Sequence, residues 1–120
     1  MASLLQMQDL GDGRYEVREF LLRSSAVPFA VAAKTSAFTA TDDDGMLLVD
    51  ASSGAVTITL PTAVGRTGQT YEVKRTNAGA NAVTVDGAGT ETIDGALTAS
   101  LATQYATVRV VSDGANWMIF

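Results

Sequence analysis

The chain has 120 residues with 13 acidic and eight basic side chains, and it contains neither cysteine nor histidine. The lack of cysteine excludes disulfides and thiolate metal sites, and the lack of histidine removes the commonest general base and metal ligand. A net charge of −5 without a basic stripe argues against nucleic-acid binding. The hydrophobic fraction of 47% and the charged fraction of 18% are typical of one globular domain.

The N-terminus shows no basic region followed by a long apolar run, so no secretory signal is predicted. No stretch approaches the ~20 consecutive apolar residues that a membrane-spanning helix needs. We therefore expect a protein that is made in the cytoplasm and does not associate with a membrane.

Residues 1–34 differ from the rest of the chain, because their four basic and four acidic side chains balance. Residues 13–23 are predicted to form a strand, with a short helix as the alternative. Residues 26–33 are apolar but include Pro28, which lacks the N–H that a continuous ladder requires. This predicts an extended segment that lies on the domain's own surface or on a neighbouring molecule.

From residue 35 onward, short alternating runs rich in Thr, Ala and Val are separated by turn signals, a pattern typical of a sandwich or barrel. In residues 55–60, Val56, Ile58 and Leu60 point to one face and the threonines to the other. The other predicted strands are 46–50, 70–75, 82–85, 105–111 and 117–120. The dipeptide Asp-Gly occurs five times, and it favours the tight hairpins of antiparallel sheets.

These patterns predict an all-β fold: a single antiparallel β-sandwich, jelly-roll-like, over residues 35–120, with an extended N-terminal segment over residues 1–34. The inward positions of the alternating runs predict the core. The predicted core residues are Leu48, Val56, Ile58, Leu60, Tyr71, Val73, Val83, Val85, Ile93, Val108, Val110 and Ile119.

The densest acidic cluster is Asp42-Asp43-Asp44, followed by Gly45. Carboxylates are the ligands that Ca²⁺ prefers, but the spacing does not match the alternating positions of a calcium-binding loop. We interpret the cluster as a solvated turn, with cation binding as the open alternative.

Asp86, Glu91 and Asp94 are the candidates for a paired-carboxylate glycosidase centre. Two of them precede glycine, and in such turns an Asp side chain bonds its own backbone. We therefore predict no catalytic residues and no enzyme activity.

Two further patterns are considered and set aside. Residues 65–68 resemble a phosphate-binding loop, but neither the Gly-Lys-Ser/Thr element nor a helix follows. Trp117 and Tyr105 are candidates for a sugar-stacking platform, and we favour packing in the core or on a sheet face. No cofactor or metal site is predicted.

A series of short motifs follows in a fixed order from Thr39 to Phe120. They are Leu48-Val-Asp50, Ser53-Gly54, Val56–Pro61, Gly68–Lys74, Asn81–Gly87, Glu91–Gly95, Val111–Gly114 and Asn116-Trp117. This order resembles the small β-sandwich modules of tailed-phage structural proteins, which occur in head-decoration (cement) proteins and at the ends of tail fibres. The resemblance covers about two-thirds of the chain.

The resemblance implies a non-enzymatic virion protein on the surface of a phage head. Its implied partners are the major capsid protein and copies of itself in a homotrimer. In tail fibres the module ends a much longer chain, whereas about 34 residues precede it here, which favours a separate decoration protein. The alternatives are a short tail-fibre or tail-tip module that binds a host surface glycan and, in another class, a polysaccharide-active enzyme.

The N-terminal segment is predicted to carry most of the attachment to the particle. Its apolar side chains are too few to form an independent core, and extended arms bind by placing side chains in pockets of a partner. The predicted partner-binding residues are Leu4, Leu5, Tyr15, Phe20, Leu22 and Phe29.

Overall fold

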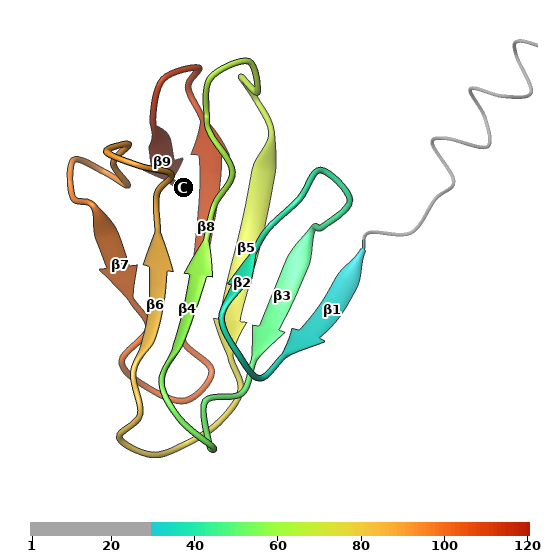
Figure 1. Ribbon diagram of the computed structural model, residues 1–120, viewed down its shortest axis with the longest axis vertical. Coiled ribbons are helices and arrows are strands. Elements are labelled where there is room, and N and C mark those ends of the chain that lie inside the picture. The colour runs from blue at the N-terminus through green and yellow to red at the C-terminus, as the bar shows by residue number, and fades with distance from the viewer. Residues whose placement is uncertain (1–29) are drawn as a thin grey trace, which may run out of the picture.

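The computed structural model describes residues 30–120, which form nine β-strands and no helix (Figure 1). The strands are β1 Val31–Lys34, β2 Phe38–Thr39, β3 Met46–Val49, β4 Val56–Thr59, β5 Thr70–Arg75, β6 Val83–Asp86, β7 Thr98–Ser100, β8 Thr107–Ser112 and β9 Trp117–Ile119. The prediction of an all-β fold is confirmed for these residues.

The strands build two sheets that pack against each other, one with the order β1-β3-β5-β8-β9 and one with the order β2-β4-β6-β7. From β1 to β6 the chain crosses to the other sheet after every strand. As a result β1, β3 and β5 run parallel in the five-stranded sheet, and β2, β4 and β6 run parallel in the four-stranded sheet. This part of the chain is a flattened coil of three turns. Strands β7, β8 and β9 then close the two sheets with antiparallel pairings.

The antiparallel prediction holds for three of these pairings and is wrong for the other four, so both sheets are mixed. The physical reason lies in the turns. Asp113-Gly114 does join the neighbouring antiparallel strands β8 and β9, whereas Asp44-Gly45 joins β2 to β3, which belong to different sheets. A tight turn can therefore reverse the chain within one sheet or carry it to the facing sheet.

Strand β1 lies within the segment that the sequence assigned to the N-terminal arm. Its four residues pair in register with β3, from Val31 opposite Met46 to Lys34 opposite Val49. The five-stranded sheet therefore includes residues 31–34.

The core lies between the two sheets, and ten of the twelve predicted core residues are buried there. Leu48 is the first exception, because the inward residues of β3 are Leu47 and Val49, and Leu48 is only half-buried. Ile119 pairs with the buried Val110 but lies on the edge strand β9, which leaves it 42% exposed.

Candidate functional site

The connections between strands gather at the two ends of the coil (Figure 1). Most of the candidate functional residues lie in these connections. One end, here called the acidic end, holds six of the nine carboxylates of the described residues. It consists of residues 40–45, 60–69, 87–97 and 113–116. The opposite end is called the arginine end, and it consists of residues 35–37, 50–55, 76–82 and 101–106.

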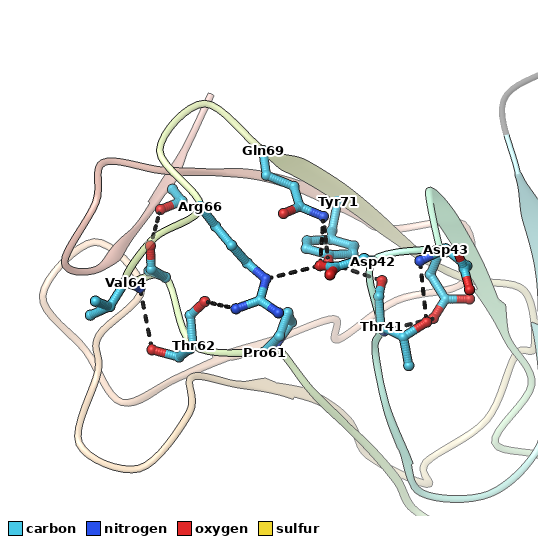
Figure 2. Close-up of polar contacts among 12 residues, drawn as sticks. Thr41, Asp42, Asp43, Pro61, Thr62, Val64, Arg66, Gln69 and Tyr71 are labelled. Atoms are coloured by element: carbon cyan, nitrogen blue, oxygen red, sulfur yellow. Dashed lines mark hydrogen bonds and ion pairs between the residues drawn. The ribbon is translucent and has the colours of Figure 1, made fainter. Parts of the chain in front are cut away.

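At the acidic end an exposed ion pair joins two connections (Figure 2). Arg66 donates from Nε to Asp42 Oδ1 at 3.0 Å, and its Nη1 donates to the carbonyl of Thr62 at 2.9 Å. The Gln69 amide also donates to Asp42 Oδ1, at 3.4 Å. These hydrogen bonds, led by that from Arg66, hold the pKa of the Asp42 carboxyl below its ordinary value.

The other two aspartates of the acidic cluster shape their own turn. Asp44 Oδ2 accepts hydrogen bonds from the Thr41 backbone N–H at 2.8 Å and from its hydroxyl at 3.1 Å, while the Asp43 N–H donates to that hydroxyl at 3.3 Å. Within residues 30–120, no group of three or more acidic side chains is arranged to hold a metal ion. This part of the chain fits the interpretation as a turn.

The three carboxylates of the glycosidase hypothesis are used separately. Glu91 accepts hydrogen bonds from the hydroxyl of Thr62 and from the N–H of Ala63, and so ties the β6–β7 connection to the β4–β5 connection. Asp94 accepts from the N–H of Ile119 at 2.9 Å, and Asp86 ends strand β6. Among the described residues, no hydrogen bond joins any two of these acids, and Glu91 and Asp94 bind different parts of the chain.

The connection that follows Asp86 is also tight. A Cβ added to Gly87 would lie 2.5 Å from the carbonyl oxygen of Glu91, a separation that real Cβ atoms essentially never show. Glycine is therefore required for this close approach. The Asp86-Gly87 pair of the resemblance thus has a structural use in forming the β6–β7 connection.

Beneath the acidic end lies a buried aromatic pair. Tyr71 and Trp117 are both fully buried, with ring centroids 5.5 Å apart in an edge-to-face arrangement. Trp117 Nε1 donates to the Pro61 carbonyl at 3.2 Å, and the Tyr71 hydroxyl donates to the Thr41 carbonyl at 3.0 Å. Burial is the largest cause that raises the pKa of Tyr71. The prediction that Trp117 packs in the core is confirmed.

Tyr105 lies apart from Trp117, at the arginine end, and is 61% exposed. Its backbone has a φ of 68°, which is uncommon for any residue other than glycine. The Tyr105 N–H donates to the Arg75 carbonyl at 2.7 Å, and the Lys74 ammonium lies 5.6 Å from the ring centroid. The structure therefore does not bring the two candidate stacking residues together.

The arginine end is built around a buried cation that is not among the candidate residues named from the sequence. Arg75 is 2% exposed, and its guanidinium donates to the carbonyls of Asn77 at 3.1 Å, Leu101 at 2.9 Å and Gly79 at 2.7 Å. The alternation Tyr71, Val73, Arg75 placed this side chain on the inner face, so the sequence contained the signal. Arg75 joins two connections of this end through their backbones.

The outward faces of the two sheets differ in chemistry. The four-stranded sheet presents hydroxyl and carboxylate side chains, namely Thr39, Thr57, Thr59, Thr84, Asp86, Thr98 and Ser100. The five-stranded sheet presents a mixture in which apolar side chains are prominent, including Val31, Met46, Leu48, Met118 and Phe120. Only the five-stranded sheet exposes large apolar groups along its outward face among the described residues.

All six predicted partner-binding residues, Leu4, Leu5, Tyr15, Phe20, Leu22 and Phe29, lie outside the described residues. The same is true of the strand predicted over residues 13–23. The attachment hypothesis therefore remains a prediction. Among residues 30–120 there is no helix of the length and apolar character required to cross a bilayer.

Comparison with known proteins gives no further assignment, since neither a protein-family model nor a curated protein matches this sequence.

Proposed function

We propose that this protein is a structural component of a tailed-phage virion, a decoration protein that binds the outside of the head and stabilises it. The observation that carries the proposal is how the polar side chains are used. Asp42, Asp44, Glu91 and Asp94 accept hydrogen bonds that join or shape connections. Side chains used in this way support a rigid binding module better than a catalytic centre.

The residues that carry the phage resemblance support the proposal in the same way. Asn116 Oδ1 accepts a hydrogen bond from the Thr92 N–H at 2.9 Å, and the neighbouring Trp117 is buried. Gly87 permits a backbone approach that no other residue allows. These motif positions build the fold, so the resemblance points to a shared architecture rather than to a shared reaction.

A decoration protein stabilises a shell by mass action, because it binds the assembled state in preference to the dissociated one. In this proposal the major capsid protein is the partner, and residues 1–29 add contacts to those of the described domain. The homotrimer that the resemblance implies stays a prediction.

Purified particles of the phage that encodes the chain test the proposal. We expect many copies distributed over the head lattice, counted by quantitative mass spectrometry and located by electron microscopy. A few copies confined to the tail would contradict it and favour a fibre module. The absence of the protein from particles would contradict both.

Rebinding to particles stripped of the protein tests the role of the N-terminal segment. The truncated chain should begin at residue 30 rather than at 35, because residues 31–34 form β1 of the five-stranded sheet. We expect residues 30–120 to fold, as judged by circular dichroism, and to bind more weakly than the full chain. Equal binding would place the contact on the domain itself.

Tyr105 favours a second candidate function, a tail-tip module that binds a host surface glycan. An exposed aromatic ring suits stacking against a sugar, and backbone strain of this kind is concentrated at functional sites. If this function is correct, the chain binds a defined set of sugars on a glycan array and Tyr105→Ser abolishes that binding. Identical glycan-array signals from the unaltered chain and from Tyr105→Ser would show that Tyr105 does not bind the sugar.

A further inference from the structure

The outward face of the five-stranded sheet has an apolar–charged–apolar pattern. It carries apolar side chains on β1 and β3 at one side and on β8 and β9 at the other, with charged side chains between them. The residues of this outer face are Val31, Ala33, Met46, Leu48, Thr70, Glu72, Lys74, Thr107, Arg109, Val111, Met118 and Phe120.

The exposed apolar side chains on this face are large. Val31 is 56% exposed, Met118 is 39% exposed and Phe120 is 57% exposed. These side chains form two apolar groups, one at each side of the sheet, with charged side chains between them. Exposed apolar groups bordered by polar ones mark sites of association in soluble domains. The outward face of the four-stranded sheet carries hydroxyl side chains, which water solvates, so it does not favour association with a partner in the same way.

The register of the strands places the key side chains in one row across the sheet. Met46 lies opposite Glu72, and Glu72 lies opposite Arg109. Phe120 completes the row, since its N–H donates to the Arg109 carbonyl at 3.0 Å. From β3 to β9 the row therefore reads apolar, acidic, basic, apolar, an order that is complementary to its own reverse. Val31 of β1 lies opposite Met46 and extends the apolar side of the row.

We propose that two copies of this chain associate face to face through the outer face, about a two-fold axis that runs parallel to the strands between β5 and β8. Such an axis exchanges β5 with β8 and β3 with β9, because each pair is equally distant from it. Glu72 then faces Arg109 of the partner subunit, and Met46 faces Phe120 of the partner subunit. This is the self-complementarity that a two-fold interface requires.

Among residues 30–120, Glu72 and Arg109 make only a loose contact with each other. Glu72 Oε2 lies 3.8 Å from Arg109 Nη1, beyond hydrogen-bond distance, and the two side chains are 27% and 50% exposed. The Arg109 guanidinium lies 4.7 Å from the centroid of the Phe120 ring, which keeps both groups on the outer face. Facing sheets pack about 10 Å apart, a separation that long side chains from both sides can bridge.

The first test is the mass of the full-length chain in solution, measured by light scattering during gel filtration over a range of concentrations. We expect a dimer that dissociates on dilution. A monomer at every concentration would overturn the proposal. A trimer would overturn it and favour the oligomer predicted from the sequence.

Charge reversal then tests the register. Arg109→Glu places two carboxylates opposite each other, and Glu72→Arg does the same with two cations, so each variant should dimerise at least about tenfold more weakly. Mixing the two variants restores opposite charges across the interface at both positions. Within each variant chain, however, positions 72 and 109 still carry the same charge. We expect the mixture to form a heterodimer.

This mixing result separates contacts between chains from the contact within one chain. Failure of the mixture to associate would overturn the two-fold register, and unaltered dimers of both single variants would place the interface elsewhere. Matched controls place the same change in net charge on the four-stranded sheet. The double variant Thr57→Glu with Thr84→Glu matches Arg109→Glu, and Thr57→Arg with Thr84→Arg matches Glu72→Arg. These controls should dimerise as the unaltered chain does. None of these measurements requires a phage particle, so they can fail while the proposed function holds.

Discussion

The two ends of the coil are each organised by an arginine, and the two arginines are in opposite environments. At the arginine end, Arg75 is 2% exposed and donates to three backbone carbonyls. At the acidic end, the side chain of Arg66 is 25% exposed and pairs with Asp42, whose side chain is 69% exposed. One cation is thus held by the backbone inside the domain, and the other by a carboxylate at its surface.

This difference predicts which end stabilises the fold. A buried charge is costly to desolvate, so its hydrogen bonds are essential and their loss leaves buried groups without partners. An exposed ion pair gains little, because water screens its charges and both side chains lose freedom when they pair. We therefore expect the arginine end to contribute more to the free energy of unfolding than the acidic end, although the acidic end contains more charged residues.

The largest effect is expected for Arg75→Met, which fills a similar volume but leaves three carbonyls without their donor. We predict a loss of about 3 kcal/mol in the free energy of unfolding, measured by urea denaturation. Arg75→Lys keeps the charge, but its compact ammonium cannot reach all three carbonyls, so it should recover only part of the loss. Near-unchanged stability of Arg75→Met would remove the basis for the comparison between the ends.

Trp117→Phe is expected to have the next largest effect, and it tests what holds the acidic end. The change removes the Nε1 hydrogen bond to the Pro61 carbonyl and leaves a gap beside Tyr71. We predict a loss of about 2 kcal/mol, followed by circular dichroism because Trp117 is the single tryptophan. Tyr105→Phe, at an exposed ring, should change stability by less than about 0.5 kcal/mol. Equal effects of the two changes would argue against a buried anchor at this end.

Two asparagines provide a matched pair across the ends. Asn81 donates from Nδ2 to the Ala51 carbonyl at 2.8 Å, and Asn116 accepts from the Thr92 N–H at 2.9 Å. Both hydrogen bonds are partly buried. Each change to alanine should cost about 1 kcal/mol in thermal or urea unfolding. Similar losses would show that the ends differ in their arginines and not in their asparagine bridges. A much larger loss for Asn116→Ala would reverse that conclusion.

Much of the core could be predicted from the sequence, because alternation directly encodes which face of a strand is buried. The prediction succeeds for β4, where polar threonines separate Val56 and Ile58. It fails for β3, because Met46, Leu47, Leu48 and Val49 are all apolar and alternation cannot choose between the two faces. A partly apolar outer face is thus what makes this strand ambiguous.

The direction of the strands could not be predicted in the same way. A short strand followed by a turn has the same local pattern whether the chain returns to its own sheet or crosses to the other. The difference depends on which distant strand it pairs with, as when Val31 in β1 pairs with Met46 in β3. Similarly, the sequence placed Arg75 in an alternating strand but could not reveal that carbonyls from residues 77, 79 and 101 meet at its side chain.

The smallest effect at neutral pH is expected for Asp42→Asn, and its pH dependence gives the finest test of the acidic end. The pKa of Asp42 is lowered in the folded protein from its ordinary value of 3.8, first by the hydrogen bond from Arg66 and then by that from Gln69. Because the folded pKa is the lower one, Asp42 adds stability above pH 3.8, and this contribution is lost as the pH falls through the folded value.

Asp42→Asn should therefore be slightly less stable than the unaltered chain at neutral pH, and the difference should vanish in acid. Thermal unfolding measured from pH 7 down to pH 2 would show the two curves converging. Some acid sensitivity should persist in the variant, because backbone N–H groups of Asn116 and Ala115 lower the pKa of Asp113, and Ser52 lowers that of Asp50. A stability difference that widens as the pH falls would mean that Asp42 is destabilising when charged, which contradicts its pairing with Arg66.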